Sequence, residues 1–266
     1  MAAPVVTLTT DFGTRDSYVA QMKGVLLQLG PPDLRVIDLG HEIAAQSVRE
    51  AALFVRECVP RFPPGTIHLV VVDPGVGSAR RPIALGWEGQ LLVGPDNGVF
   101  AWLPPPSRPL QAHCISAPDG AISATFHGRD LFAPAAARLA RGEPLTALGP
   151  PIADLAALPW PSAAVRGGRL CGEVIHIDRF GNAITNIDRD DPRLLTAEAA
   201  QVSLGGRTIG PIRGHYAQAQ AGELLALFGS SGLLEIAARD GSAAHIAAAA
   251  VGDEVAVALT QRAPRP

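Results

Sequence analysis

A chain of 266 residues with 47% hydrophobic side chains is long enough for two domains, each with its own core. Its net charge of -3, with 22 Lys and Arg residues scattered along the sequence, offers no basic patch for nucleic acid. The longest apolar runs, residues 66–72 and 243–251, are far shorter than the roughly 18–20 residues of a membrane span, so we expect no membrane partner.

The cysteines and the first residues both favour a cytoplasmic protein. Cys58, Cys114 and Cys171 are odd in number and form no CxxC pair, which is typical of buried, reduced thiols. The sequence starts without a basic stretch followed by an apolar segment, so we expect no secretory signal. The cysteines also lack the spacing of a zinc site, and we expect no bound metal.

The first 160 residues alternate between strand-like and helix-like segments. Residues 18–29 and 48–58 carry apolar side chains at helical spacing. Gly30-Pro31-Pro32 ends the first of these helices, and Ser47 caps the second. In chain order, we expect a strand at 4–10, a helix at 18–29, a strand at 34–39, a helix at 48–58, strands at 66–72, 90–93 and 112–115, and a helix at 131–139.

Three of the predicted strands end in an aspartate with glycine or proline within two residues. Asp11 follows the first strand, Asp73 follows the buried strand at 66–72, and Asp96 follows the strand at 90–93. Each aspartate by itself is explained as a turn residue. Because ligands of open α/β sheets bind at the carboxyl ends of the strands, three aspartates at equivalent ends favour a site there.

The composition changes at residues 149–168, where four prolines mark an extended connector. Short strand-like segments separated by glycine turns follow it. They lie at 170–177, 182–187, 200–204, 224–228, 234–237 and 254–259. We therefore predict an N-terminal α/β sandwich-like domain with a mostly parallel sheet at residues 1–160. A small all-β barrel domain would occupy residues 166–262.

A polar constellation remains after the familiar motifs are excluded. Asp73 and Arg80 lie on one glycine-rich loop, and His127 lies in the segment FHGRD, where Gly128 allows close backbone approach. A carboxylate, a guanidinium and an imidazole suit general base catalysis, in which the aspartate orients the ring and the histidine accepts a proton. The same three residues are also explained by a structural ion-pair network. Spacing alone leaves both interpretations open.

Taken together, these segments resemble the S-adenosyl-L-methionine (SAM) hydrolase family, also called SAM hydroxide adenosyltransferases, which is related to fluorinase and chlorinase. The similar segments follow the family's order along the chain. They are TDFGTRD at 10–16, VDPGVGSAR at 72–80, PDNG at 95–98, FHGRD at 126–130, IDRFGN at 177–182 and SSGxLEIA at 230–237. The family architecture, an α/β domain followed by a small β-barrel, agrees with the predicted fold.

The resemblance implies roles for residues in the first domain. Asp73, Arg80 and His127 match the hydrolase triad. Asp11 would bind the ribose diol, since one carboxylate can accept from two adjacent hydroxyls. Asp16 would face the ammonium group of the methionine part.

The resemblance also implies substrate contacts in the second domain. Asp178 would face the same ammonium group, and Ser230 with neighbouring backbone amides would bind the methionine carboxylate. Phe180 and Tyr216 would sandwich the adenine, with Asn182 bonded to its edge. SAM is then the substrate, and no cofactor is implied. Family members place this substrate between one subunit's first domain and the neighbour's barrel, so a homotrimer is implied.

The implied reaction is hydrolysis of SAM to adenosine and L-methionine, with in-line attack of activated water at C5′. The leaving sulfonium becomes a neutral thioether, so the difficult step is activation of water. Two alternatives stay open. A SAM-dependent halogenase would not need the Asp and His of the triad, and fluorinase has Arg where this chain has Ser231. A non-catalytic SAM or adenosine sensor would need the binding residues but not the triad.

Overall fold

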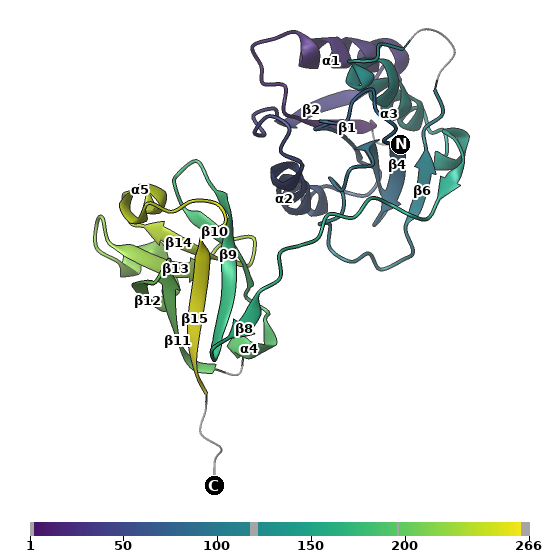
Figure 1. Ribbon diagram of the computed structural model, residues 1–266. Helices are drawn as coiled ribbons and strands as arrows, with labels where there is room; N and C mark the ends of the chain where they lie inside the picture. Colours follow the sequence, from purple (N-terminus) through teal and green to yellow (C-terminus); the bar gives the residue numbers. More distant parts are fainter. Residues whose placement is uncertain (1–2, 118–121, 196, 262–266) are drawn as a thin grey trace. The chain divides into compact units, whose positions relative to one another are not determined.

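The computed structural model describes residues 3–117, 122–195 and 197–261. The chain divides into two compact units, Met1–Pro159 and Trp160–Pro266 (Figure 1). The outermost limits of the predicted domains, residues 1 and 262, lie outside the described residues. The predicted fold class, an α/β domain followed by an all-β barrel, is confirmed.

The first unit is built on one seven-stranded sheet in the order β2-β1-β3-β5-β4-β6-β7. The four strands from β2 to β5 run parallel, whereas β4 is antiparallel to both of its neighbours. The strands are β1 (Val5–Thr10), β2 (Arg35–Gly40), β3 (Ile67–Val71), β4 (Pro82–Trp87), β5 (Gln90–Pro95), β6 (Gln111–Cys114) and β7 (Pro151–Ile152).

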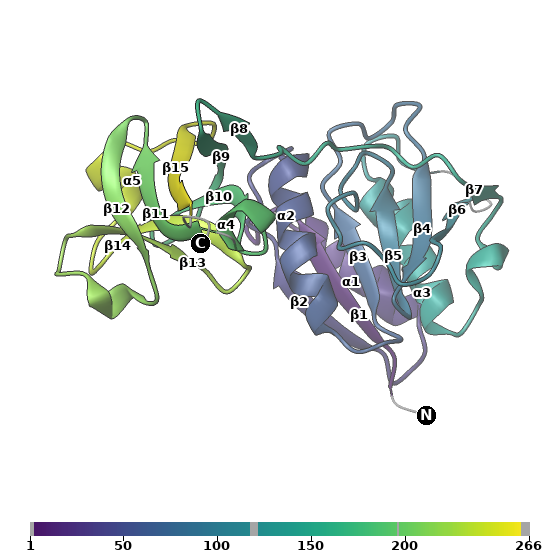
Figure 2. The same ribbon diagram turned by 90° about the horizontal axis from the view of Figure 1, so that it is seen from below.

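Helices cover both faces of this sheet. α1 (Tyr18–Leu29) and α3 (Ala133–Ala140) pack on one face, where Met22 and Val71 belong to the same buried cluster. α2 (Val48–Cys58) packs on the other face, where Val72 and Leu85 are buried. Figure 2 shows α2 in front of the strands, with α1 and α3 behind them. Because successive residues of β3 point to opposite faces, this central strand is buried on both sides, as its apolar run predicts.

The two N-terminal helices have the limits that the sequence predicts. The Ser47 hydroxyl accepts a hydrogen bond of 3.3 Å from the Glu50 amide, which caps α2. The helix predicted at 131–139 starts earlier than expected, because a π-helical turn (Gly128–Phe132) leads directly into α3. Two short 3₁₀ turns, η1 (Val59–Arg61) and η3 (Leu145–Ala147), complete the helical structure described for this unit.

The second unit is a closed barrel of seven strands. Its order is β10-β14-β13-β12-β11-β15-β9, and pairing of β9 with β10 closes the ring. β8 (Ala164–Arg166) adds to β9 outside the ring. The barrel strands are β9 (Arg169–Ile177), β10 (Ala183–Asp188), β11 (Ala197–Leu204), β12 (Arg207–Arg213), β13 (Leu224–Phe228), β14 (Leu233–Ala238) and β15 (Glu254–Gln261). Short helical turns lie between them, namely α4 (Pro192–Leu195), η4 (Tyr216–Gln218) and α5 (Ala243–Ala247).

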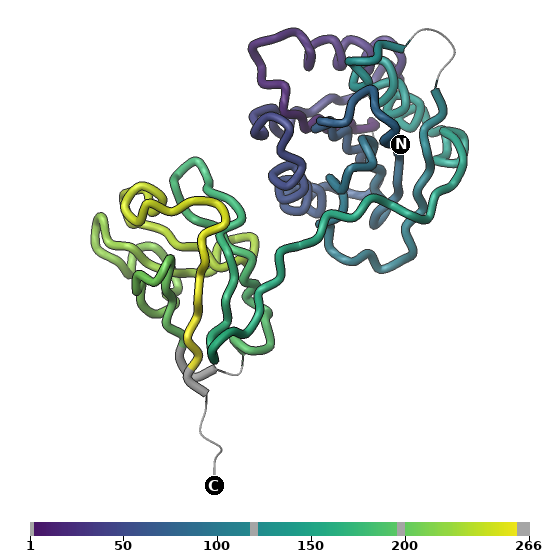
Figure 3. Tube along the Cα trace, in the orientation of Figure 1, coloured from purple at the N-terminus to yellow at the C-terminus, as the bar shows by residue number. Residues whose placement is uncertain are grey.

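The differences from the predicted elements have local causes. β4 and β12 were not expected; β4 begins at Pro82, and β12 contains Gly210 and Pro211, which weaken a strand pattern. The predicted connector at 149–168 includes β7 and β8, and the chain between these two strands carries neither helix nor strand (Figure 3).

Two further sequence expectations concern membrane spans and thiols. No helix among the described residues has the length and apolarity needed to cross a bilayer. All three cysteines are free thiols, and Cys171 is buried as expected. Cys58 and Cys114 are only half-buried, so the expectation of burial is wrong for these two.

Candidate active site

The three strand-end aspartates lie along one edge of the first unit's sheet. β1, β3 and β5 are parallel neighbours, and Asp11, Asp73 and Asp96 follow their carboxyl ends. The three side chains nevertheless have different surroundings.

Asp96 anchors the chain within the first unit. Its carboxylate is 5% exposed and accepts hydrogen bonds from Arg81 Nε at 2.9 Å and from the Ala156 amide at 2.7 Å. Arg81 also pairs with Asp154 at 2.7 Å. This network ties residues 154–156 to the end of β5, so the turn interpretation suffices for Asp96.

Asp73 and Arg80 form a buried ion pair. Arg80 Nε donates to Asp73 Oδ1 at 2.9 Å and to Oδ2 at 3.0 Å, and its Nη2 also donates to Oδ2. The side chains are only 5% and 9% exposed. The guanidinium lies over the Phe132 ring, 5.1 Å from its centre. A planar cation held by two carboxylate oxygens and an aromatic face has one fixed orientation.

His127 contacts this pair through Arg80. Arg80 Nη2 lies 2.6 Å from His127 Nδ1. Because a guanidinium only donates, Nδ1 is the acceptor, and the neutral ring carries its proton on Nε2. Among the described residues no hydrogen bond joins Asp73 to the ring. The expected contact, in which the aspartate orients the imidazole directly, is therefore replaced by one through the guanidinium.

Charge and burial keep His127 neutral. Burial and then the Arg80 cation lower the pKa of His127 below its ordinary value, and these effects outweigh the opposing charges of Asp73 and Asp130. At neutral pH the ring therefore presents an N–H at Nε2 and a lone pair to Arg80.

Backbone features bring the loop that carries Asp73 and Arg80 close to the segment that carries His127. Gly77 has φ +76°, and a Cβ there would lie 2.7 Å from the Ala124 carbonyl oxygen. The loop after β3 thus packs against the segment that precedes His127. Gly128 is also closely packed, since a Cβ would meet the Met22 sulfur at 3.1 Å. His127 itself occupies the position directly before a π-helical turn, an irregularity that is frequent at functional sites.

Asp11 and Asp16 lie on the loop between β1 and α1. Asp11 Oδ2 accepts a hydrogen bond of 2.7 Å from the Gln46 amide, and Asp16 is exposed. Near them is a cluster of three rings that the sequence did not single out. Its centroid separations are 5.5 Å, 6.0 Å and 5.2 Å, and its members are Phe12, Tyr18 and Phe126. Phe126 directly precedes His127, so an aromatic surface adjoins the polar group.

In the second unit, Asp178 organises the turn between β9 and β10. Its Oδ1 accepts from the amides of Phe180 at 2.9 Å and Asn182 at 2.8 Å, and its Oδ2 accepts from Asn182 Nδ2 at 2.9 Å. Asn182 is buried, whereas the Phe180 ring is 75% exposed. A large apolar ring standing out from a turn this well bonded is a candidate ligand contact.

Tyr216 and Ser230 lie on two other connections of the barrel. Tyr216 starts η4, its ring is 44% exposed, and its hydroxyl donates to Glu235. Burial and this bond raise the pKa of Tyr216 to about 12. Ser230 is exposed in the turn between β13 and β14, which Gly232 closes with a 3.1 Å bond to the Gly229 carbonyl. Glu235 was not expected from the sequence, where its signal is a single charge in an otherwise apolar strand.

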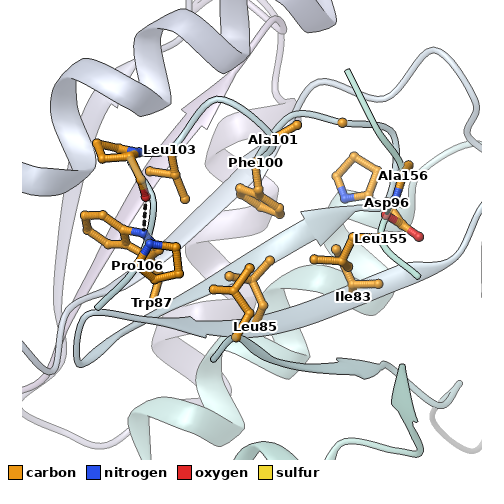
Figure 4. Close-up of a pocket in the computed structure, with 14 residues that line it drawn as sticks. Ile83, Leu85, Trp87, Asp96, Phe100, Ala101, Leu103, Pro106, Leu155 and Ala156 are labelled. Carbon is orange, nitrogen blue, oxygen red and sulfur yellow. Dashed lines mark hydrogen bonds between the residues drawn. The ribbon is translucent and has the colours of Figure 1, made fainter. Parts of the chain in front are cut away.

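A separate cavity of about 240 Å³ lies on the α2 face of the first unit (Figure 4). Its lining is mostly apolar, and the Asp96 carboxylate on its wall is already paired. Residues 80 and 127 do not line it. Within the described ranges, no group of three or more His, Cys, Asp or Glu side chains is placed to hold a metal ion.

Comparisons with known proteins cover both units. A family model described as the SAM hydroxide adenosyltransferase N-terminal domain matches residues 6–149, and the model of the C-terminal domain matches residues 172–256. The chain is 44% identical to an (R)-S-adenosyl-L-methionine hydrolase of Thermus thermophilus, over 90% of this chain and 93% of that protein.

More distant relatives and a solved structure are also similar to this chain. A fluorinase of Actinoplanes sp. is 30% identical over 71% of this chain and 73% of its own length. The crystal structure of an uncharacterized conserved protein from Thermotoga maritima superposes with a TM-score of 0.83 at 32% identity. The superposition covers 95% of this chain and 99% of that one.

Proposed function

Because the chain belongs to the SAM hydroxide adenosyltransferase family, we propose that it hydrolyses SAM to adenosine and L-methionine. The observation that supports this most is the continuous arrangement of Asp73, Arg80 and His127, in which a fixed cation donates to one nitrogen of an imidazole whose other nitrogen carries the proton. Such a pair binds and stabilises a small anionic oxygen nucleophile.

The nucleophile is water that reacts as hydroxide. Bulk water has a pKa of about 15.7, and a nearby cation favours its ionised form. Arg80 supplies that charge, Asp73 fixes the guanidinium, and the Nε2–H of His127 donates the hydrogen bond to the hydroxide. The lone pair on Nδ1 is taken by Arg80, so the proton leaves to solvent rather than to the ring.

The reaction balances without a general acid. Hydroxide forms the O5′–C5′ bond as the C5′–sulfur bond breaks, and the electron pair of that bond neutralises the sulfonium. The products are adenosine, neutral methionine thioether and the proton released from water. No cofactor takes part in this scheme. In-line placement of the nucleophile supplies much of the rate enhancement.

The substrate contacts proposed from the resemblance are compatible with the local geometry of each unit. Asp11 would bind the ribose diol, with one carboxylate oxygen also bonded to Gln46. Asp16 and Asp178 would face the ammonium group; Asp178 keeps unused lone pairs, since each carboxylate oxygen can accept more than one bond.

The remaining contacts would come from the barrel. Phe180 and Tyr216, both with exposed rings, would enclose the adenine. The buried Asn182 would bond the adenine edge, and the exposed Ser230 would bind the methionine carboxylate.

Incubation with SAM in ¹⁸O-labelled water tests the proposal. We expect adenosine labelled at O5′ and free methionine, since the nucleophile is water. Formation of 5′-halo-adenosine in chloride or fluoride buffer would instead indicate a halogenase, to which the fluorinase relatives correspond. SAM recovered unchanged from a stable complex would indicate a sensor.

We also propose that the protein is a homotrimer whose sites take residues from two subunits. The proposed ribose and nucleophile residues lie in the first unit, and the proposed adenine residues lie in the second. A contact of the first unit of one subunit with the second unit of the next closes into a ring.

A further inference from the structure

Glu235 is a buried acid on the outer face of the barrel. Its neighbours Leu234 and Ile236 belong to the barrel core, so Glu235 points to the other side of β14. There it is only 7% exposed, and its Oε1 accepts the hydroxyl hydrogen of Tyr216. A buried carboxyl group is costly unless it has such a partner.

The same carboxyl group lies under the turn that carries Ser230. A Cβ on Gly229 would lie 2.5 Å from Glu235 Oε2, so the absence of a side chain at Gly229 makes room for the carboxylate. Burial raises the pKa of Glu235, and the nearby Asp178 charge raises it further, whereas the bond from Tyr216 lowers it. The Asp178 charge also raises the pKa of Tyr216. Glu235 therefore contacts Tyr216 and lies against the turn that carries Ser230, two residues proposed to contact substrate.

Tyr216 depends on this contact for its orientation. It lies in a three-residue 3₁₀ turn with a half-exposed ring, and the turn itself leaves its side-chain torsions free. A hydrogen bond from a phenol to a carboxylate is short and directional. It holds the ring in one position before any ligand arrives.

We propose that Glu235 is a positioning residue that fixes the Tyr216 ring for stacking on the adenine of the substrate. This inference rests on the proposed function, because it takes an adenine nucleoside as the ligand. A ring ordered in advance loses less entropy on binding, so Glu235 contributes to nucleoside affinity and little to the chemical step.

The test is a double-mutant cycle on adenosine binding by the full-length protein, together with kcat and KM for SAM. Tyr216→Phe and Glu235→Ala should each weaken adenosine binding and raise KM by roughly three- to tenfold, the range for one immobilised side chain. The value of kcat should stay within about twofold. Glu235→Gln keeps an acceptor oxygen and should retain most of the affinity. Glu235→Ala added to Tyr216→Phe should have no further effect.

Controls separate positioning from folding. Glu254→Gln, an exposed acid on β15, should change neither binding nor melting temperature. The chain has two tyrosines, so a fluorotyrosine label read by ¹⁹F NMR in Tyr18→Phe protein reports on Tyr216 alone. Its resonance should broaden or move toward the free-ring position in Glu235→Ala without any ligand.

Several outcomes would overturn the inference. Glu235→Ala could weaken binding equally with and without the Tyr216 hydroxyl, or Tyr216→Phe could bind adenosine as tightly as the unmodified protein. An unchanged ¹⁹F resonance in Glu235→Ala would have the same meaning. If Glu235→Ala does not fold, adenosine binding by the Glu235→Gln and Tyr216→Phe proteins still tests the inference. Absence of SAM hydrolysis, with the ¹⁹F and adenosine results as expected, would contradict only the proposed function.

Discussion

At the scale of single residues, the proton on His127 decides how water is activated. The Arg80 guanidinium occupies Nδ1, so the neutral ring donates from Nε2. Burial and Arg80 lower the pKa of His127, while Asp73 and Asp130 oppose this. Protonation would place a second cation against Arg80 and remove their hydrogen bond. We therefore expect kcat/KM to fall as the pH drops through that lowered pKa, below about 6.5.

The dependence of kcat/KM on pH above pH 7 distinguishes two roles of His127. The ring either donates a hydrogen bond to hydroxide or accepts the proton of water. Binding of hydroxide predicts that kcat/KM rises further above pH 7, because more nucleophile is ionised. A ring that accepts the proton itself would give a level profile between pH 7 and 9. Measuring initial rates across pH 5 to 9 with adenosine as the detected product decides between them.

Substitution of Asp73 or His127 should lower kcat more than it changes KM. His127→Ala and Asp73→Asn should each lower kcat by at least about a hundredfold, since each weakens stabilisation of the nucleophile. KM should change little, because the proposed substrate contacts lie elsewhere. His245→Ala, an exposed histidine on α5, is the matched control and should keep full activity. Near-normal turnover by His127→Ala would contradict the assignment.

The sequence predicted these side chains better than their contacts. Asp73, Arg80 and His127 could be selected because Asp73 and Arg80 share a glycine-rich loop that follows a strand, and His127 precedes Gly128. The order of contacts, Asp73 to Arg80 to His127, could not be predicted from the sequence. It depends on how the loop after β3 packs, because this packing decides which group lies between the other two. Glu235 was missed because a single acid in LLEIAA does not disturb the pattern of a buried strand.

At the scale of elements, the loop between β3 and β4 fixes the guanidinium. Gly77 has a left-handed backbone, and a Cβ there would clash with the Ala124 carbonyl. Gly77→Ala should therefore lower the free energy of unfolding by about 1–3 kcal/mol and reduce kcat more than KM. Gly65→Ala is informative as a control, because its φ of +87° is also left-handed but its Cβ would meet nothing within 4 Å. It should destabilise the protein with little loss of kcat.

The limits of the two long N-terminal helices were predicted accurately, whereas the short helices α4 and α5 were not expected. α1 and α2 have unambiguous end signals, Gly30-Pro31-Pro32 and Ser47, so their limits follow from local chemistry. β4 and β12 each form a hairpin with a neighbouring strand, β5 and β11, and this pairing compensates for their prolines and glycines. The closure of the barrel is a tertiary property that a list of strands does not contain, since it requires β15 to pair with the distant strand β9.

At the scale of the whole molecule, complementation tests the proposed trimer. Asp73→Asn affects the first unit, and Asn182→Ala affects the second. Each protein alone should be nearly inactive. After dissociation, mixing and reassembly, a shared site would combine an intact first unit from one chain with an intact barrel from another, and activity should rise well above either parent. Mixed oligomers that stay as inactive as the parents would show that each site belongs to one chain.

The place of β15 in the barrel has a consequence for synthesis on the ribosome. This last strand pairs with both β11 and β9, so the ring remains open until residues Glu254–Gln261 have been made. The first unit, whose final strand is β7, can fold more than a hundred residues earlier in translation. Until β15 has been made, the nascent chain therefore displays two unpaired strand edges, which makes the barrel the part that needs protection from aggregation.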